Sequence, residues 1–161
     1  MLGAIPLLIK DTYKTFFKDT KTVITIHNSA FLGTLEPSSL GDLYNLSMIH
    51  YENSGVTLFG KVSTLKAGIT YADKIVAVSP TNKHELLRQE TSNGLDGPLW
   101  YREKDFLGIL NGIDYEEFNP SSDNFIAKNF TVDNVFTEKK KNKKDLCYKM
   151  MLKNEDAPLF A

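Results

Sequence analysis

The sequence predicts an α/β fold in which helices flank a parallel sheet. Three strand-like segments are apolar without polar alternation, which is typical of strands buried on both faces of a parallel sheet. Helix-like segments separate them, and each strand-like segment stops abruptly at a polar residue. The three segments are residues 23–26 before His27, residues 75–78 before Ser79 and residues 106–110 before Asn111.

These three polar residues define the first candidate site. In an open α/β sheet, ligands bind beyond the carboxyl ends of the strands, and parallel strands place those ends at one edge. His27, Ser79 and Asn111 are therefore expected to line one crevice although they lie far apart in the sequence.

The composition is that of a globular domain without a strong charge bias. The chain has 161 residues, 42% of them hydrophobic and 24% charged, with a formal net charge of -1. This balance argues against a nucleic-acid partner. No apolar run approaches the roughly 18 residues needed to cross a bilayer, so no membrane partner is expected. Cys147 is the only cysteine, which excludes an internal disulfide and fits a reducing compartment.

The chain is expected to begin at a helix over residues 5–17, with the strand that should precede this helix absent. Pro6 is compatible only with the first turn of such a helix. The first strand follows at residues 22–26. The apolar residues that share one face at helical spacing are Ile5, Leu8, Ile9, Tyr13, Phe16 and Phe17.

The remaining elements follow from periodicity and turn residues. Residues 28–57 are expected to be irregular, with a short helix near 40–49. An amphipathic helix is expected over residues 59–72, and Ser79-Pro80 opens another helix as N-cap and first-turn proline. Residues 91–105 are expected to form a polar loop, residues 133–152 a last helix, and residues 157–161 the start of a strand.

Each candidate also has a structural interpretation. His27 is either a site group that exchanges hydrogen bonds with a ligand in the crevice or a histidine bonded to a nearby backbone carbonyl. A simple turn explains the pair Asn111-Gly112, and helix capping is the preferred interpretation of Ser79. The aromatic residues Tyr51 and Trp100-Tyr101 either stack on sugar rings or cover the edge of the core.

The sequence lacks the motifs of phosphate-binding loops and of metal sites. The sequence has no G-x-G-x-x-G or G-x-x-x-x-G-K run, so a phosphate-binding glycine loop is not expected. It has no closely paired Asp-x-Asp, and His84-Glu85 lacks the second histidine of a zinc motif. The lysine-rich residues 138–145 are expected to be a solvated helix face.

Five stretches resemble, in the same order, motifs of bacterial glycogen synthases and plant starch synthases. Any one of them is weak, but five in order over nearly the whole chain are specific. They are T-I-H-N-S-A-F-L-G at residues 25–33, K-A-G-I-T-Y-A-D at 66–73, V-S-P-T at 78–81, G-L-D-G at 94–97, and G-I-L-N-G-I-D at 108–114 with F-N-P at 118–120.

The resemblance implies a Rossmann-like α/β domain, an incomplete N-terminal half of a two-domain GT-B glycosyltransferase. Residues 1–156 would be part of the N-terminal catalytic domain. Residues 157–161 would be the interdomain connection or the first strand of the missing C-terminal domain. Such enzymes transfer glucose from ADP-glucose to the non-reducing end of an α-1,4-glucan with retention, and they need no metal or other cofactor. The fragment is expected to be inactive alone.

The resemblance also implies roles for individual residues. His27 would be the catalytic histidine near the transferred glucose, and Asn111 with Gly112 would bind substrate in the same site. Asn28 and the turn from Phe31 to Gly33 would shape the pocket floor. Phe31 stands where tyrosine is common in the family and Leu32 where glutamine is common, so two polar groups are lost from the pocket edge.

Two other functions remain open. One is a non-catalytic glucan-binding or scaffold fragment, which would bind a maltooligosaccharide without transfer. The other is an unrelated nucleotide-binding α/β enzyme such as a dehydrogenase, against which the missing glycine fingerprint argues. The resemblance implies ADP-glucose (bound with the missing C-terminal domain) and an α-1,4-glucan acceptor as partners. It implies the bacterial cytoplasm, or the plastid stroma of a plant or alga, as location.

Overall fold

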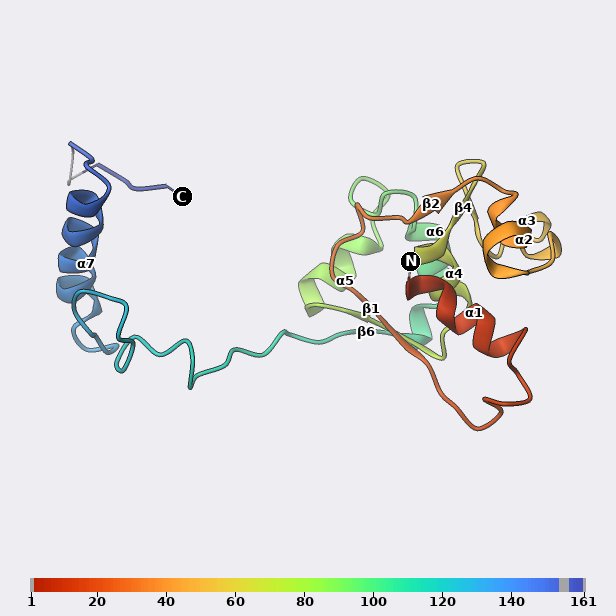
Figure 1. Cartoon of the computed structure of the whole chain (residues 1–161), viewed down its shortest axis with the longest axis horizontal. Helices are drawn as coiled ribbons and strands as arrows, with labels where there is room; N and C mark the ends of the chain where they lie inside the picture. The colour runs from red at the N-terminus through yellow and green to blue at the C-terminus, as the bar shows by residue number, and fades with distance from the viewer. Residues whose placement is uncertain (1, 154–156, 161) are drawn as a thin grey trace. The chain divides into compact units, whose positions relative to one another are not determined.

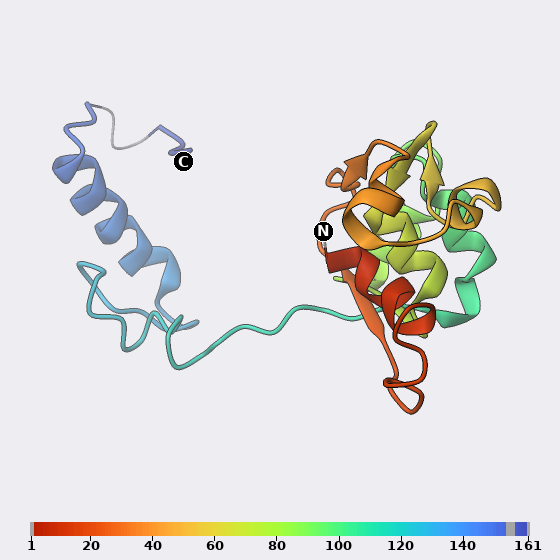
Figure 2. The same ribbon diagram turned by 45° about the vertical axis from the view of Figure 1, so that its right-hand side comes forward.

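The computed structural model describes residues 2–153 and 157–160, which form two compact units, Met1–Asn111 and Gly112–Ala161 (Figures 1 and 2). The first unit contains both sheets and all the strands described below. The second unit contains one long helix. We describe each unit by itself.

The main sheet of the first unit has three parallel strands in the order β1-β5-β6. They are β1 (Val23–Ile26), β5 (Lys74–Ala77) and β6 (Phe106–Gly108). The register aligns Ile26 with Ala77 and Ala77 with Gly108. The predicted parallel sheet is therefore confirmed, and its three carboxyl ends lie side by side.

Only one face of this sheet is covered, so the expectation of burial on both faces is wrong. Ile26, Ile75 and Phe106 are each at most 2% exposed and point into the core. On the opposite face, Val23 is 62% exposed and Leu107 is 50% exposed. The apolar strands suit a doubly covered sheet, but among the described residues no element of this unit covers the second face.

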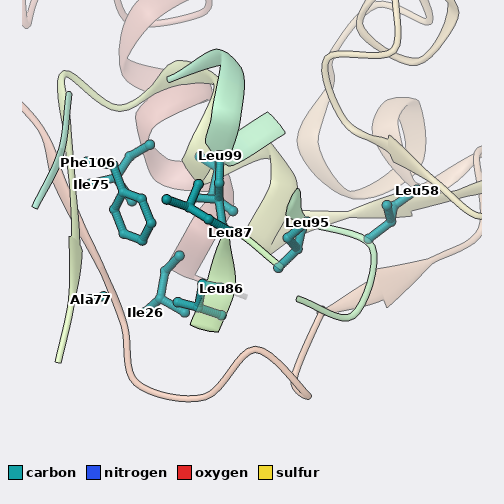
Figure 3. Packing of buried hydrophobic residues seen from close by; sticks show 10 residues of the cluster. Ile26, Leu58, Ile75, Ala77, Leu86, Leu87, Leu95, Leu99 and Phe106 are labelled. Carbon is teal, nitrogen blue, oxygen red and sulfur yellow. The ribbon is translucent and has the colours of Figure 1, made fainter. Parts of the chain in front are cut away.

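The helices of the first unit supply the covered side. Apart from two short helices described below with the second sheet, they are η1 (Leu2–Ala4), α1 (Ile5–Lys10), α4 (Thr64–Tyr71), α5 (Pro80–Leu86), α6 (Asp96–Tyr101) and η2 (Glu103–Asp105). Both η1 and α1 pack against α4. Figure 3 shows the core cluster, in which Phe106 and Ile75 of the sheet meet leucines that follow β5 in the chain.

The N-terminal helix is shorter than expected. α1 ends at Lys10, and residues 11–19 form successive turns rather than a helix. Threonine and aromatic residues of modest helix propensity fill this stretch. Phe16 is 83% exposed, so no packing compensates for that propensity. Pro6 lies in the first turn of α1, as predicted.

A second, antiparallel sheet lies where the sequence predicted an irregular region over residues 28–57 and the start of a helix at residue 59. Its order is β2-β4-β3, with β2 at Thr34–Leu35, β3 at Thr57–Leu58 and β4 at Lys61–Ser63. Two short helices, α2 (Ser39–Tyr44) and α3 (Ile49–Glu52), replace the single predicted helix near residues 40–49.

The hairpin from β3 to β4 overturns the predicted helix start at residue 59. Phe59 and Gly60 form its two-residue loop with φ of 50° and 74°. Positive φ at both loop residues is the geometry of the turn that best matches strand twist. The helix α4 starts only at Thr64, where the Ser63 side chain caps it.

The predicted polar loop at residues 91–105 is also wrong, because it contains α6 and η2. Leu95 and Leu99 are four residues apart, which is helical spacing, and both are fully buried. The polar and glycine residues around them predicted a loop instead. The Trp100 indole N–H donates to the Leu87 carbonyl at 2.8 Å, which ties α6 to the end of α5.

The second unit confirms the predicted last helix, which is α7 (Val135–Lys149). Cys147 on this helix is 1% exposed. Residues 157–160 form no strand, and Ala161 lies outside the described residues. The division predicted between residues 156 and 157 stays a prediction. Among the described residues, no helix is long and apolar enough to span a membrane.

Candidate functional site

The three predicted polar residues follow the aligned ends of the main sheet. His27 comes directly after β1, Ser79 two residues after β5, and Asn111 three residues after β6. Because the last residues of the three strands are in register, all three segments leave the sheet at the same edge.

A cavity of about 690 Å³ lies beside β1 and brings two candidates together. His27 and Phe31 both line it, and Phe31 is 78% exposed. Neither Asn28, Gly33, Asn111 nor Gly112 is among the described residues that line this cavity. The other lining residues come from η1 and α1, from β1 and the residues before it, and from the start of α4: Leu2, Gly3, Ile5, Pro6, Ile9, Thr20, Lys21, Thr22, Val23, Ile24, Thr25, Thr64 and Leu65.

The loop after His27 is held by its own side chains. The Asn28 carboxamide oxygen accepts from the backbone N–H of Ala30 at 2.8 Å, so Asn28 closes a local turn. The Asn93 side chain donates to the Ser29 hydroxyl at 2.9 Å. This second bond joins the loop after β1 to the loop before α6, and no sequence motif pointed to Asn93.

The far end of the same loop is pinned to the start of α4. The buried Ser63 hydroxyl donates to the Leu32 carbonyl at 2.7 Å, and the Thr64 N–H donates to the Gly33 carbonyl at 3.1 Å. Gly33 has φ of 60°, and a Cβ atom there would collide with the Thr64 hydroxyl. Only glycine fits this turn, which gives the predicted Gly33 a structural reason.

Ser79 is a helix cap, as preferred from the sequence. Its hydroxyl accepts from the Asn82 N–H at 2.8 Å, and Pro80 occupies the first turn of α5. This satisfies one of the free N–H groups of the helix. The role of Ser79 in the fold is therefore accounted for without a ligand.

Asn111 and Gly112 stay predictions as substrate-binding residues. Both are exposed, and the division between the two units falls between them. Asn111 ends the first unit and Gly112 begins the second, so only Gly112 has no defined position relative to His27.

The strongest electrostatic feature lies at the opposite end of the strands from His27. The Asp73 carboxylate accepts from the Thr22 N–H at 2.8 Å and from the Thr22 hydroxyl at 3.0 Å. These bonds, with the charge of Lys10, lower the pKa of Asp73 to about 2 against the opposing effect of burial. Asp73 therefore stabilises the start of β1 and is remote from the candidate chemistry.

Two of the three aromatic candidates are held by a hydrogen bond to a backbone carbonyl, and the third is exposed. Tyr51 donates its hydroxyl to the Gly60 carbonyl at 2.9 Å, and Trp100 is anchored at Leu87. Tyr101 is 90% exposed. Among the described residues, no group of three or more His, Cys, Asp or Glu side chains is placed to hold a metal ion.

Known proteins match nearly the whole chain. A family model of the starch synthase catalytic domain matches residues 1–101. A glycogen synthase of Clostridium kluyveri is 41% identical over 164 residues, which cover 99% of this chain and 34% of that protein. A glycogen synthase of Fervidobacterium nodosum is 42% identical over 159 residues, which cover 95% of this chain and 32% of that protein.

A solved structure agrees with these matches. The catalytic domain of starch synthase IV from Arabidopsis thaliana, bound to ADP and acarbose, matches with a TM-score of 0.79 and 28% identity. The match covers 96% of this chain and 32% of that one. The chain thus spans about a third of the length of the curated relatives that it matches. With most of its length matched by the family model and by close relatives, the chain belongs to the starch synthase catalytic domain family.

Proposed function

We propose that this chain forms part of a retaining glucosyltransferase that moves glucose from ADP-glucose to the non-reducing end of an α-1,4-glucan. The observation that carries the proposal is the position of His27. It lies in the T-I-H-N stretch directly after β1, at the carboxyl edge of the sheet, and it lines the cavity beside β1. Family membership and the ADP and acarbose bound to the starch synthase IV relative support the same substrate classes.

His27 is proposed as the catalytic residue near the transferred glucose. An oxocarbenium-like transition state is stabilised by fixed dipoles and hydrogen bonds, which a histidine held at a strand end can provide. Phe31 contributes an apolar wall to the same cavity. Asn28 and Gly33 shape the loop, and Asn111 with Gly112 are proposed to bind substrate from the end of β6.

Since the chain spans about a third of its relatives' length, the rest of such an enzyme is proposed to be provided by the other two thirds. Residues 1–156 are proposed as part of the N-terminal domain and residues 157–161 as the connection to, or first strand of, a C-terminal domain. ADP-glucose would be bound together with that domain. The bacterial relatives support a location in the bacterial cytoplasm.

A chimera tests this function. We would replace the matching third of the Clostridium kluyveri glycogen synthase with this chain and measure glucosyl transfer from ADP-glucose to glycogen. The chimera should be active, and His27→Ala should lower its turnover by roughly tenfold or more. His84→Ala, which removes a histidine from α5, is the matched control and should retain turnover.

Two results would contradict the proposal. Full turnover by the His27→Ala chimera would remove the assigned role of this residue. A folded chimera that binds maltooligosaccharide without any transfer would favour the glucan-binding scaffold instead.

A further inference from the structure

The first unit has a smaller cavity, of about 280 Å³, away from the one that His27 lines. It is lined by the turn after α3, by one face of α4 and by α6, which packs against α4. The lining residues include Ser54, Lys66, Thr70 and Tyr101, and none of them borders the cavity beside β1. All of them lie between positions 53 and 102, so the whole cavity belongs to one unit and has a defined geometry.

Lys66 is a partly buried cation in this cavity. Its Nζ atom donates to the Thr57 carbonyl at 2.6 Å, which uses one of the three N–H donors of the ammonium. Within the described part of the chain, no Asp or Glu forms an ion pair with Lys66. Burial lowers its pKa, with no opposing effect from a nearby carboxylate. An anion beside Lys66 would therefore stabilise its charged form.

Two hydroxyl groups accompany Lys66. Thr70 lies one turn later on the same face of α4, and Ser54 lines the cavity from the turn after α3. Among the described residues, neither hydroxyl has a hydrogen-bond partner. Arg102 also lines the cavity, but its N–H groups already donate to backbone carbonyls and to Asp105. The donors left for a ligand are thus the remaining N–H bonds of Lys66 and the two hydroxyls.

This set of donors fits a phosphate group. Lysine binds phosphate as a point charge, without a glycine-rich loop, and hydroxyls donate to the remaining oxygens. No acidic side chain is among the described residues that line the cavity, so none repels an anion there. Tyr101 is 90% exposed beside it, and its ring offers an apolar face to a sugar. The small volume limits the ligand to phosphate with at most one sugar ring.

We propose that the cavity lined by Ser54, Lys66, Thr70 and Tyr101 binds a phosphate group, as free phosphate or as a phosphorylated monosaccharide. The Lys66 ammonium and the two hydroxyls hold the phosphate oxygens. The Tyr101 ring lies against the sugar where one is present. This site shares no residue with the set proposed for glucosyl transfer, so either assignment can fail while the other holds.

Titration of the 161-residue chain with inorganic phosphate tests the site. Backbone amide NMR signals of Ser54, Lys66 and Thr70 should shift saturably at constant ionic strength, with a Kd below about 10 mM. Lys66→Met keeps an unbranched side chain, removes the charge and should weaken binding by roughly tenfold or more. Lys61→Met is the matched control and should retain binding, because Lys61 pairs with Glu36 and does not line the cavity.

A second variant keeps the test independent of the folding of Lys66→Met. Thr70→Val preserves the shape of the residue and removes one hydroxyl, so it should weaken phosphate binding by roughly threefold or more. Circular dichroism checks that each variant is folded.

Glucose 1-phosphate distinguishes the two forms of the ligand. Tighter binding than inorganic phosphate, with the gain lost in Tyr101→Ala, would assign the site to a phosphorylated monosaccharide. Equal binding of the two probes would assign it to free phosphate.

Four results would overturn the proposal. The first three are no saturable shift with phosphate, unchanged binding by folded Lys66→Met, and the same shifts with chloride at equal ionic strength. The fourth is a saturable shift with maltotriose but not with phosphate, which would make the cavity a site for neutral sugar. None of these readouts depends on glucosyl transfer.

Discussion

Individual side chains hold the main sheet together at the end remote from His27. The Arg102 guanidinium donates to the carbonyls of Ile69, Thr70, Ala72 and Asp73 and pairs with Asp105. It therefore satisfies carbonyls at the end of α4 that have no partner within the helix. Lysine cannot replace this fork of donors, because its ammonium is a single point of charge.

Asp73 makes the stability of the first unit depend on pH. Its pKa is about 2 in the folded chain against an ordinary value of 3.8. A lowered pKa means that its contribution is present above the ordinary value and is lost as the pH falls from about 4 to about 2. Asp73→Asn should therefore flatten the decline of the unfolding free energy over this range.

Urea unfolding at a series of pH values, followed by Trp100 fluorescence, measures the effect. Asp19→Asn removes an exposed carboxylate elsewhere and is the control. An Asp73→Asn variant with the same acid dependence as the unchanged chain would show that other groups control it.

Residues with a local role were predictable, whereas residues with a distant partner were not. Ser79 caps α5 by accepting from the N–H of Asn82, only three residues later, and the pattern Ser-Pro at a strand end indicates this. Asn93 bonds Ser29, which lies 64 residues earlier, and Arg102 bonds carbonyls about 30 residues earlier. No spacing in the sequence indicates such pairs.

At the scale of elements, the two serines that cap helices differ in the number of segments that they join. The Ser79 hydroxyl accepts one bond from the backbone of α5. The Ser63 hydroxyl accepts from the Lys66 N–H at 3.1 Å and also donates to the Leu32 carbonyl. Ser63 is fully buried and joins β4, α4 and the loop after His27.

Removing these two caps should therefore have unequal costs. Ser79→Ala should lower the unfolding free energy by about 1 kcal/mol. Ser63→Ala should lower it by about 2 kcal/mol, because it also removes the shorter of the two bonds to the Leu32 carbonyl and leaves only the Leu65 N–H, at 3.2 Å, as its donor. Denaturant titration of both variants tests the order, and equal losses would mean that the bond to Leu32 contributes nothing.

The apolar strands of the main sheet and the 15-residue helix α7 were predicted well, whereas the second sheet and α6 were not. The three parallel strands follow from uninterrupted apolar runs, and α7 follows from a stretch long enough for several helical turns. The β3–β4 hairpin was missed because its loop places Phe59 at positive φ, where glycine or asparagine is usual. The helix α6 was missed because Asn93-Gly94 and Asp96-Gly97 indicate turns more strongly than Leu95 and Leu99 indicate a helix.

At the scale of the whole molecule, the main liability is the face of the main sheet that no described element of the first unit covers. Val23 and Leu107 lie on this face, and the outer strands leave open edges. We expect the chain expressed alone to be marginally stable and to self-associate through this surface. A sharp two-state melt at high temperature would count against this expectation.

The double variant Val23→Thr, Leu107→Thr tests the source of self-association. Threonine keeps the strand preference and reduces the apolar surface. Light scattering over a range of concentrations should show a lower mean mass than for the unchanged chain. Val132→Thr, which changes a 90% exposed residue of the second unit, should leave the mass unchanged. If it lowers the mass as much, the sheet face is not the contact.

The candidate site could be predicted only as far as the main sheet defines it. Aligned strand ends place His27, Ser79 and Asn111 at one edge, and the sequence alone indicated this. The cavity that joins His27 to Phe31 depends on how α1 packs beside β1, which no local pattern reveals.

The single tryptophan and the single cysteine lie in different units. Trp100 is bonded to Leu87 within the first unit, and Cys147 is buried on α7 in the second. Each unit thus carries a natural probe that needs no label. Indole fluorescence follows loss of structure in the first unit, while thiol alkylation follows opening of the second. One sample can therefore show whether the two units unfold together or one after the other.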